Sequence, residues 1–428
     1  MIEKVTENQK KLSFQEFKNE VLTDYKTALI SRECSLLGRR EVLTGKAKFG
    51  IFGGGKEIPQ LAMAKAFKPG DWRSGYYRDQ TFMMAIGKYS PKHFFSSLYA
   101  HPDIEVDPYS AGRQMNGHFA THSIDEDGSW NKLSEQYNVS SDISPTAGQM
   151  PRLVGLAEAS KKFRTIEGLD KDHYLSNNGN EVAWGTIGNA STSEGPFFEA
   201  INAAGVLEIP MVISIWDDDY GISVHSKYQT TKEDISEILK GFQREEGGQG
   251  YEIFVVDGWD YTGLVDVYSK AGKIAREEHV PVMIHVKGLT QPQGHSTSGS
   301  HERYKSPERL QWEQEHDGIL KMREWILQFE LEDANGELLK FVDGEEELEK
   351  LEKEAKRTVS QAKREAWNDF VKPMVEERAI LMQLMDRAAR KSQNSIFIDK
   401  LKRELAEIDE PIRKNILTAA RRSLIYLK

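Results

Sequence analysis

The sequence contains a single cysteine, Cys34, among its 428 residues. A lone thiol rules out an intramolecular disulfide and suits a reducing compartment. Long apolar runs are also missing, because nothing approaches the roughly 18 consecutive apolar residues that a membrane-spanning helix requires. Residues 1–17 lack the apolar core of a signal peptide and are too acidic for a transit peptide. We therefore expect a cytoplasmic protein without a membrane segment.

An excess of basic residues is absent as well. Lys and Arg total 57 against 67 Asp and Glu, which gives a net charge of -10 at pH 7. Such a chain lacks the electrostatic footprint of proteins that bind nucleic acids or anionic membranes, so we expect neither partner. The length allows one large α/β domain with appendages, or two ordinary domains.

The middle of the chain alternates between two hydrophobic patterns. Short apolar runs occupy 182–187, 211–216, 252–256 and 281–287, and helical segments occupy 194–208, 231–243 and 262–278. This alternation predicts an α/β fold, with a parallel sheet flanked by helices. Each apolar run is followed by polar or glycine-rich residues. Because ligands of open parallel sheets bind outside the carboxyl ends of the strands, we expect a ligand site at that edge.

Both ends of the chain show helical periodicity. Apolar residues from Phe14 to Leu29 predict an N-terminal helix, and the face formed by Leu348, Leu351, Ala355, Val359, Ala362 and Ala366 predicts another. A last helix is expected from about residue 411, with Ile412, Ile416, Leu417, Ala420, Leu424 and Ile425 as its apolar residues.

These patterns divide the chain into three parts. We expect an N-terminal helical arm (1–45), a ligand-binding domain (46–330) that is loop-rich up to residue 150, and a helical C-terminal extension or linker (331–428). Three roles remain open for the C-terminal tail. It folds back on its own domain, or it faces a partner, or it is a linker to a further domain.

The stretch "GTIGNASTSEG", Gly185 to Gly195, has the features of a phosphate-binding turn. An apolar run breaks into glycine and small hydroxylated residues, and a helix follows, whose free N–H groups and dipole favour an anion. No Gly-Lys-Ser/Thr follows, so this is not a Walker sequence. A bound diphosphate normally needs a metal, and a metal prefers a carboxylate, but the turn offers Asn189.

A carboxylate follows the next predicted strand, in "ISIWDDDYGIS", Ile213 to Ser223. About one strand–helix–strand unit separates Gly188 from Asp218, so both residues can border the same crevice. Mg²⁺ accepts carboxylate, amide, carbonyl and phosphate oxygens in octahedral geometry. We therefore predict a magnesium site that includes the amide oxygen of Asn189 and the carboxylate of Asp218.

With these motifs in view, the sequence resembles the alpha chain, or the alpha half of a fused chain, of the thiamine-diphosphate-dependent decarboxylating component of 2-oxoacid dehydrogenase complexes, nearer the branched-chain type. The resemblance covers most of residues 40–330. It includes "GDWRSGYYRDQ", "GRQM", "GQMPRLVGLAEA", "SEGPFFEA" and "GHSTS", which begin at Gly70, Gly112, Gly148, Ser193 and Gly294. The resemblance implies a thiamine-diphosphate-binding fold.

The resemblance also implies roles for individual residues. The cofactor-binding candidates are Tyr77, Arg78, Ser144, Gly188, Asn189, Ala190, Ser191, Asp218, Tyr220, Ile222 and His295. Asn189, Asp218 and the backbone carbonyl of Tyr220 would bind Mg²⁺, and a potassium ion is a further candidate near Ser144. His295 is the implied catalytic residue, which would steady the cofactor phosphate or reaction intermediates. His118 and His301 are weaker candidates for substrate contact.

The sequence departs from the family at the metal and diphosphate positions. The turn normally carries Asp and the strand end Asn-Asn, so Asn189 and Asp218 look like an exchange of amide and acid. Trp216 and Gln291 stand where the branched-chain enzymes tend to carry arginines.

The implied function is oxidative decarboxylation of a 2-oxo acid, branched-chain or pyruvate, through Mg²⁺–thiamine diphosphate, with acyl transfer to a lipoyl-bearing acyltransferase. In this family a beta chain supplies the glutamate that protonates the aminopyrimidine, and we find no convincing candidate for it here. The chain is therefore expected to be incomplete without a beta chain or fused beta half, in an alpha2beta2-type assembly. Two alternatives remain, a transketolase-like thiamine enzyme without a lipoyl partner and a non-catalytic scaffold subunit with a degenerate metal site.

Overall fold

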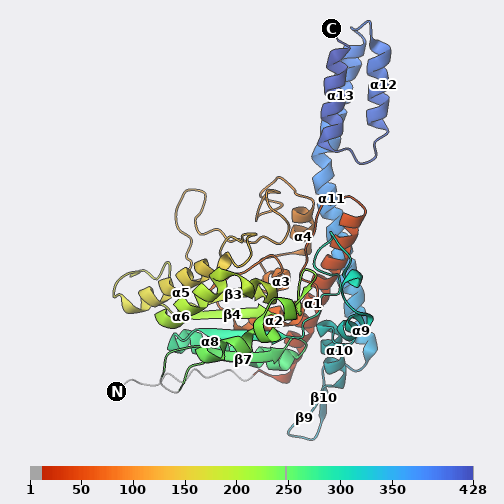
Figure 1. Ribbon diagram of the computed structural model, residues 1–428. Helices are drawn as coiled ribbons and strands as arrows, with labels where there is room; N and C mark the ends of the chain where they lie inside the picture. Colours follow the sequence, from red (N-terminus) through yellow and green to blue (C-terminus); the bar gives the residue numbers. More distant parts are fainter. Residues whose placement is uncertain (1–11, 246–247, 428) are drawn as a thin grey trace.

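A twisted parallel sheet forms the centre of the computed structural model, which describes residues 12–245 and 248–427. Within these residues six strands pair side by side in parallel, in the order β2-β1-β3-β4-β8-β7 (Figure 1). Their bounds are Trp72–Ser74 (β1), Asn138–Val139 (β2), Ala183–Gly188 (β3), Met211–Trp216 (β4), Glu252–Asp257 (β7) and Val282–Lys287 (β8). The predicted parallel α/β sheet is confirmed.

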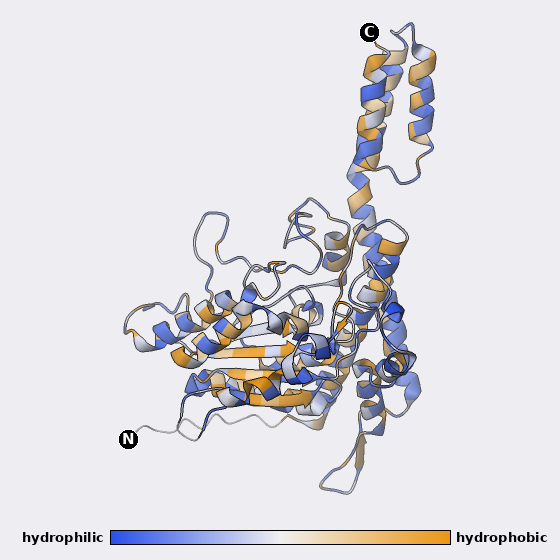
Figure 2. Cartoon of the chain, in the orientation of Figure 1, coloured by the Kyte–Doolittle hydropathy of each residue, from blue (hydrophilic) through white to orange (hydrophobic). Residues whose placement is uncertain are grey.

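Helices cover both faces of this sheet, so the central strands are mostly apolar. Because side chains alternate along a strand, Val212 belongs to one hydrophobic cluster and Ile213 to the other. On the first face lie α2 (Glu57–Ala66) and α8 (Tyr261–Glu278), and on the second α5 (Gln149–Thr165) and α6 (Gly195–Leu207). The strands are accordingly among the most continuously hydrophobic segments in Figure 2.

The predicted N-terminal helix is confirmed as α1 (Phe14–Leu43). Ser13 accepts from the backbone N–H of Glu16, and Glu16 in turn accepts from the backbone of Ser13, which satisfies the free donors of the first turn. The prediction that no leader peptide is present concerns residues that lie mostly outside the described part, which begins at residue 12. No helix in the described part combines the length and hydrophobicity needed to cross a bilayer.

The prediction of one helix over 231–243 is wrong. This segment contains three short turns, η3 (Thr231–Glu233), α7 (Ile235–Ile238) and η4 (Leu239–Phe242). The break has a local cause, because Lys232 adopts a left-handed φ of 61° and Asp234 is extended, with its side chain capping the N-terminus of α7. Further short elements include α3 (Gln80–Ala85), α4 (Pro91–Leu98), α9 (Pro307–Glu315), α10 (Gly318–Gln328), and the hairpins β5–β6 (Tyr220–Gly221, Val224–His225) and β9–β10 (Glu330–Glu332, Leu338–Lys340).

The C-terminal tail has two parts with different surroundings. The first half of α11 (Glu345–Ala389) packs against α1 and α4, and five of the six predicted face residues are buried, with Leu351 partly so. Its second half joins α12 (Ser395–Ala406) and α13 (Arg413–Ile425) in a helical projection that stands away from the sheet (Figure 1). The projection has its own hydrophobic cluster. The three-part division of the chain stays a prediction.

The predicted apolar face of the last helix is only partly correct. Ile416 is buried with Ala419 and Ser423, which follow it at helical spacing. Leu424 and Ile425 point away and are 62% and 67% exposed. The last helix therefore leaves large apolar side chains in solvent at the outer end of the projection.

Candidate active site

The turn after β3 and the acidic segment after β4 begin at the same end of the sheet. The register of β3 and β4 pairs Gly188 with Trp216, so Asn189 and Asp217 follow adjacent strands at the same edge. Asn189–Ser193 forms a short 3-10 turn (η1), and α6 begins only at Gly195, slightly later than predicted. The hairpin after β4 lies against this turn, since a Cβ atom at Gly221 would be 2.4 Å from that of Ala190. The structure thus brings together the two segments that carry most of the predicted cofactor residues.

An ion pair that the sequence reasoning missed occupies this edge. The Nζ atom of Lys56 lies 2.6 Å from Oδ2 of Asp218, and both residues are buried. Lys56 precedes α2 and follows Gly53–Gly55, where Gly55 has a φ of +90° and a Cβ atom would lie 2.0 Å from the carbonyl oxygen of Thr290. Only glycine permits that approach, which carries the lysine into the site. The string "GGGK", which ends at Lys56, is the local sequence signal that could have drawn attention to this lysine.

Both carboxylate oxygens of Asp218 are engaged. Burial is the largest single influence and raises the pKa of Asp218. The charge and hydrogen bond of Lys56, with the charges of Arg78 and Lys305, together outweigh burial, so the pKa lies below its ordinary value. The second oxygen, Oδ1, accepts from the backbone N–H of Tyr220 at 3.2 Å. No cluster of three or more His, Cys, Asp or Glu side chains in the described residues is arranged to hold a metal. The carboxylate predicted to bind Mg²⁺ therefore already has a cation beside it.

Arg78 and His295, both predicted cofactor residues, are in direct contact. Arg78 is 3% exposed and donates to the carbonyl oxygens of Phe52 at 2.5 Å and of His295 at 2.9 Å. Its Nη2 atom also lies 3.0 Å from Nδ1 of His295. Burial, with a further contribution from the Arg78 charge, lowers the pKa of His295 to about 4. The imidazole is therefore neutral at pH 7.

Tyr77 and Ser144 meet through His118. Nε2 of His118 lies 2.8 Å from Oγ of Ser144, and the rings of His118 and Tyr77 are 6.4 Å apart between centroids. Gly117, with a φ of +81°, allows this loop to approach the backbone of Tyr77, because a Cβ atom there would lie 2.4 Å from its carbonyl oxygen. The predicted residues Tyr77 and Ser144 thus belong to one group, and His118 is the side chain that connects them.

Two further basic side chains, Lys305 and Arg309, lie over the ring of Tyr220. Nζ of Lys305 lies 5.2 Å from the ring of Tyr220 and pairs with Glu313 at 2.6 Å. Arg309 pairs with Asp219 and donates to the carbonyl oxygen of Asp218 at 3.1 Å. No motif in the sequence marked these two basic residues.

Ile222 is the predicted cofactor residue with the most unusual conformation. Its side chain is 61% exposed, and its backbone has a φ of +58°. A β-branched residue in this left-handed region is strained, because its Cβ substituents approach the backbone. An exposed apolar side chain held in a strained conformation points to a contact that the isolated chain does not provide.

Several buried polar atoms of the site have no hydrogen-bond partner among the described residues. They include Nδ2 of Asn189, Oγ1 of Thr290, both amide atoms of Gln293 and Nδ1 of His301. Such atoms are costly to bury and usually mark a ligand or water position. Trp216, by contrast, is fully buried against Tyr76, so the position where relatives tend to carry an arginine is part of the core.

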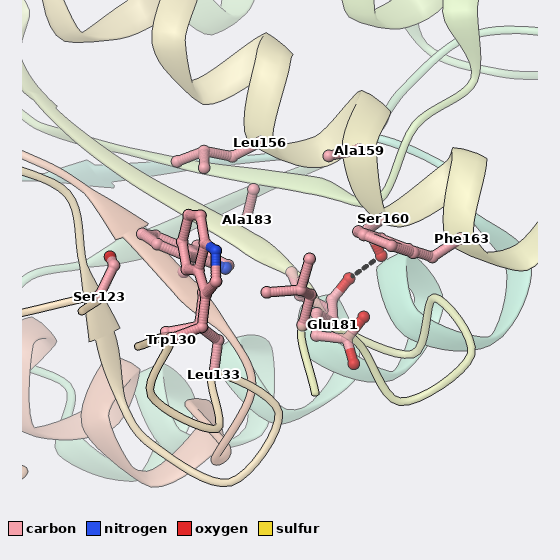
Figure 3. Close-up of a pocket in the computed structure, with 12 residues that line it drawn as sticks. Ser123, Trp130, Leu133, Leu156, Ala159, Ser160, Phe163, Glu181 and Ala183 are labelled. Atoms are coloured by element: carbon pink, nitrogen blue, oxygen red, sulfur yellow. Dashed lines mark hydrogen bonds between the residues drawn. The ribbon is translucent and has the colours of Figure 1, made fainter. Parts of the chain in front are cut away.

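An apolar cavity of about 310 Å³ lies elsewhere, at the beginning of β1 and β3. Figure 3 shows Trp130 and Leu133 of the covering loop on one side and Leu156 and Ala159 of α5 on the other. Because the predicted cofactor residues gather at the ends of the strands, this cavity is separate from the candidate site.

Comparison with known proteins agrees with this arrangement. The profile of the family described as "Dehydrogenase E1 component" matches residues 25–374. The chain belongs to this family. The resemblance stated from the motifs is thereby confirmed, and family membership implies dependence on thiamine diphosphate.

Individual relatives of the dehydrogenase E1 component family share about a quarter of their residues with this chain. The chain is 26% identical to the 2-oxoisovalerate dehydrogenase subunit alpha of Bacillus subtilis over 312 residues, 72% of this chain and 82% of that protein. It is 27% identical to the mitochondrial subunit alpha 1 of Arabidopsis thaliana over 66% of this chain and 52% of that protein. The human mitochondrial subunit alpha is 25% identical over 72% of this chain and 61% of that protein. The match thus spans between about half and about four fifths of these relatives.

Proposed function

We propose that this chain is the diphosphate-binding alpha subunit of a thiamine-diphosphate-dependent 2-oxoacid dehydrogenase. The reaction is the oxidative decarboxylation of a 2-oxo acid, branched-chain or pyruvate, followed by acyl transfer to a lipoyl-bearing protein. Family membership and the names of the relatives, which are 2-oxoisovalerate dehydrogenase alpha subunits, support the branched-chain type.

The buried guanidinium of Arg78 is the observation that carries the proposal. Its hydrogen bonds go to two carbonyl oxygens and one imidazole nitrogen, and the salt bridges of the described residues include no carboxylate for it. The carboxylate of Asp218 is near enough to act on this charge, but the hydrogen bonds of the guanidinium go to neutral acceptors, which favours a further anion beside it. The planar fork of arginine matches a phosphate group, so a diphosphate is the anion that suits this position.

The site residues divide the work of binding and orienting the cofactor. Arg78 would hold the diphosphate, together with the free N–H groups of the turn at Asn189–Ser193. Tyr77, Ser144 and Ile222 would contact the rest of the cofactor. Because Nδ1 of His295 accepts from Arg78, its proton resides on Nε2, which can donate to a phosphate or to the reacting oxygen. When bound, thiamine diphosphate supplies the electron sink for decarboxylation.

The metal predicted with the cofactor does not fit the observed donors. Mg²⁺ requires about six oxygen ligands, and the one carboxylate offered to it is engaged on both oxygens. Mg²⁺ at Asn189, Asp218 and Tyr220, and potassium near Ser144, stay predictions, and no step of the proposed reaction is derived from them.

The proposal includes partners. A beta chain, or a fused beta half, would supply the glutamate that acts on the aminopyrimidine, and a lipoyl-bearing acyltransferase would take the acyl group. We further propose an alpha2beta2-type assembly and a cytoplasmic location. The exposed side chain of Ile222 is consistent with a site that a second chain completes.

Titration calorimetry of the full chain with thiamine diphosphate and with thiamine tests the proposal. We expect thiamine diphosphate to bind and thiamine, which lacks the diphosphate, to bind far more weakly. Failure of thiamine diphosphate to bind even after a beta chain is added would favour the scaffold alternative. Turnover of sugar phosphates without a lipoyl protein, once a beta chain is added, would favour the transketolase-like alternative.

A further inference from the structure

Lys56 lies at the position where the sequence predicted a metal. Its ammonium is 2.6 Å from Oδ2 of Asp218, while Asn189, the other side chain of the predicted metal site, keeps a buried Nδ2 atom without a partner among the described residues. The two residues of the pair are 162 positions apart and meet because Gly55 lets its backbone approach Thr290. The ion pair is therefore a feature of the folded site, rather than of a flexible surface.

A divalent metal at Asp218 would have to share the carboxylate with the ammonium of Lys56. Mg²⁺ binds its oxygen ligands at about 2.0–2.1 Å, and Lys56 already takes one oxygen while the backbone N–H of Tyr220 takes the other. Two cations on one carboxylate would also repel strongly in a buried site. Arg78 also acts on this carboxylate, so a divalent ion would add to two positive charges that are already present.

Lys56 retains the capacity to bind a ligand. A lysine ammonium has three N–H donors. Lys56 lies immediately before α2, and its acceptors among the described residues are Asp218 and, at 3.4 Å, the carbonyl oxygen of Thr290. At least one N–H remains for an oxygen of a bound diphosphate.

We propose that the ammonium of Lys56 takes the place of the divalent metal, so that this chain binds the diphosphate of its cofactor without Mg²⁺. Asp218 then holds the ammonium in position instead of binding a metal. This inference rests on the proposed function, because it concerns the same diphosphate. The inference also explains why amide and acid are exchanged relative to the family. Without a metal the turn can carry the neutral Asn189, and the carboxylate of Asp218 is needed to bind the ammonium of Lys56.

The first test compares affinities of the unaltered full chain for thiamine diphosphate in EDTA and in excess Mg²⁺, by calorimetry. We expect dissociation constants that agree within about twofold, and no Mn²⁺ bound to the complex by electron paramagnetic resonance. An affinity at least tenfold higher in Mg²⁺, or one Mn²⁺ bound per chain, overturns the inference and leaves the proposed function intact. Absence of thiamine diphosphate binding under both conditions, with a beta chain added as well as without one, overturns the proposed function and the inference with it.

The second test uses Lys56→Gln, with Lys65→Gln as its matched control. Lys65 lies in the last turn of the same helix and pairs with Glu20 and Asp24. Loss of a charge-assisted hydrogen bond predicts about 10- to 100-fold weaker binding in EDTA for Lys56→Gln, with affinity restored by Mg²⁺ once Asp218 is free. Lys65→Gln should bind like the unaltered chain. Unchanged affinity of folded Lys56→Gln in EDTA would contradict the inference, and if that variant does not fold, the first test decides alone.

Discussion

Nη2 of Arg78 donates to His295 twice, to the ring nitrogen Nδ1 at 3.0 Å and to the backbone carbonyl oxygen at 2.9 Å. A guanidinium can only donate, so the ring must accept at Nδ1 and carry its proton on Nε2. The same contact fixes the ring orientation and the tautomer. One arginine therefore determines the donor direction of the candidate catalytic histidine and adds to the burial that keeps the ring neutral.

We expect Arg78→Lys to weaken thiamine diphosphate binding by about 10- to 100-fold, although the charge is conserved. A lysine provides a point charge without the planar fork that serves a phosphate and the two His295 acceptors together. Calorimetric titration measures the loss. Arg357→Gln, at an exposed position of α11, is the control for removal of a positive charge and should bind normally. Equal affinities for both variants would show that Arg78 does not hold the diphosphate.

We expect His295 to make stability depend on pH between about 6.5 and 4. The unfolded chain binds a proton at the ordinary histidine pKa of about 6.5, whereas the folded chain resists protonation until about pH 4. The unfolded state thus binds more protons in this window, and the free energy of unfolding falls as pH falls through it. His295→Asn keeps an acceptor for Arg78 and removes this proton-binding difference. Urea unfolding at pH 7 and pH 5 should show a smaller loss in the variant, and parallel losses would refute the assignment.

Ile222→Gly should change stability and cofactor binding in opposite directions. Glycine adopts the φ of +58° without strain, so the free energy of unfolding of the chain alone should rise by about 1 kcal/mol. The same change removes the exposed side chain that would contact the cofactor, so binding should weaken. Urea unfolding and calorimetry measure the two effects. Ser223→Gly, at the neighbouring exposed position, is the control, and a loss of stability in Ile222→Gly would contradict the argument.

Ile398→Ala should destabilise the helical projection without affecting the site. Ile398 is fully buried in the hydrophobic cluster that α11, α12 and α13 share, and truncating a buried isoleucine costs about 2–5 kcal/mol. Hydrogen exchange should accelerate in α12 and α13 while the affinity for thiamine diphosphate stays unchanged. Ile396→Ala, on the same helix but 77% exposed, provides the matched control. A change in affinity would show that the projection is coupled to the site.

The sequence predicted the central sheet and the two site segments that follow its strands because their signals are local. The runs ending at Gly188 and Trp216 are continuous and buried, and each is followed at once by its polar residues. Strands β1 and β2, of three and two residues, are too short to produce such a pattern. The helix expected over 231–243 had suitable periodicity, but Asp234 competes with a continuous helix by capping a new one.

The parts of the site that come from distant segments could not be predicted. Lys56 reaches Asp218 across 162 positions, and the decisive feature is the close approach of Gly55 to Thr290, which leaves no periodic signal. Glycine before lysine at a helix start is common, so the string alone does not identify a partner. The family resemblance assigns roles only to positions that match the family's motifs. It therefore gives no role to Lys56, which we propose takes the place of the metal.

The long helix α11 also affects how the size of this protein should be measured. Its 45 residues extend about 68 Å at 1.5 Å per residue, and only the first half of this length packs against α1 and α4. A molecule with such a projection diffuses more slowly than a sphere of equal mass. Gel filtration calibrated with globular standards will therefore overstate its mass, so a single chain can elute like a larger assembly. Sedimentation equilibrium, which is independent of shape, is the method that can count the chains.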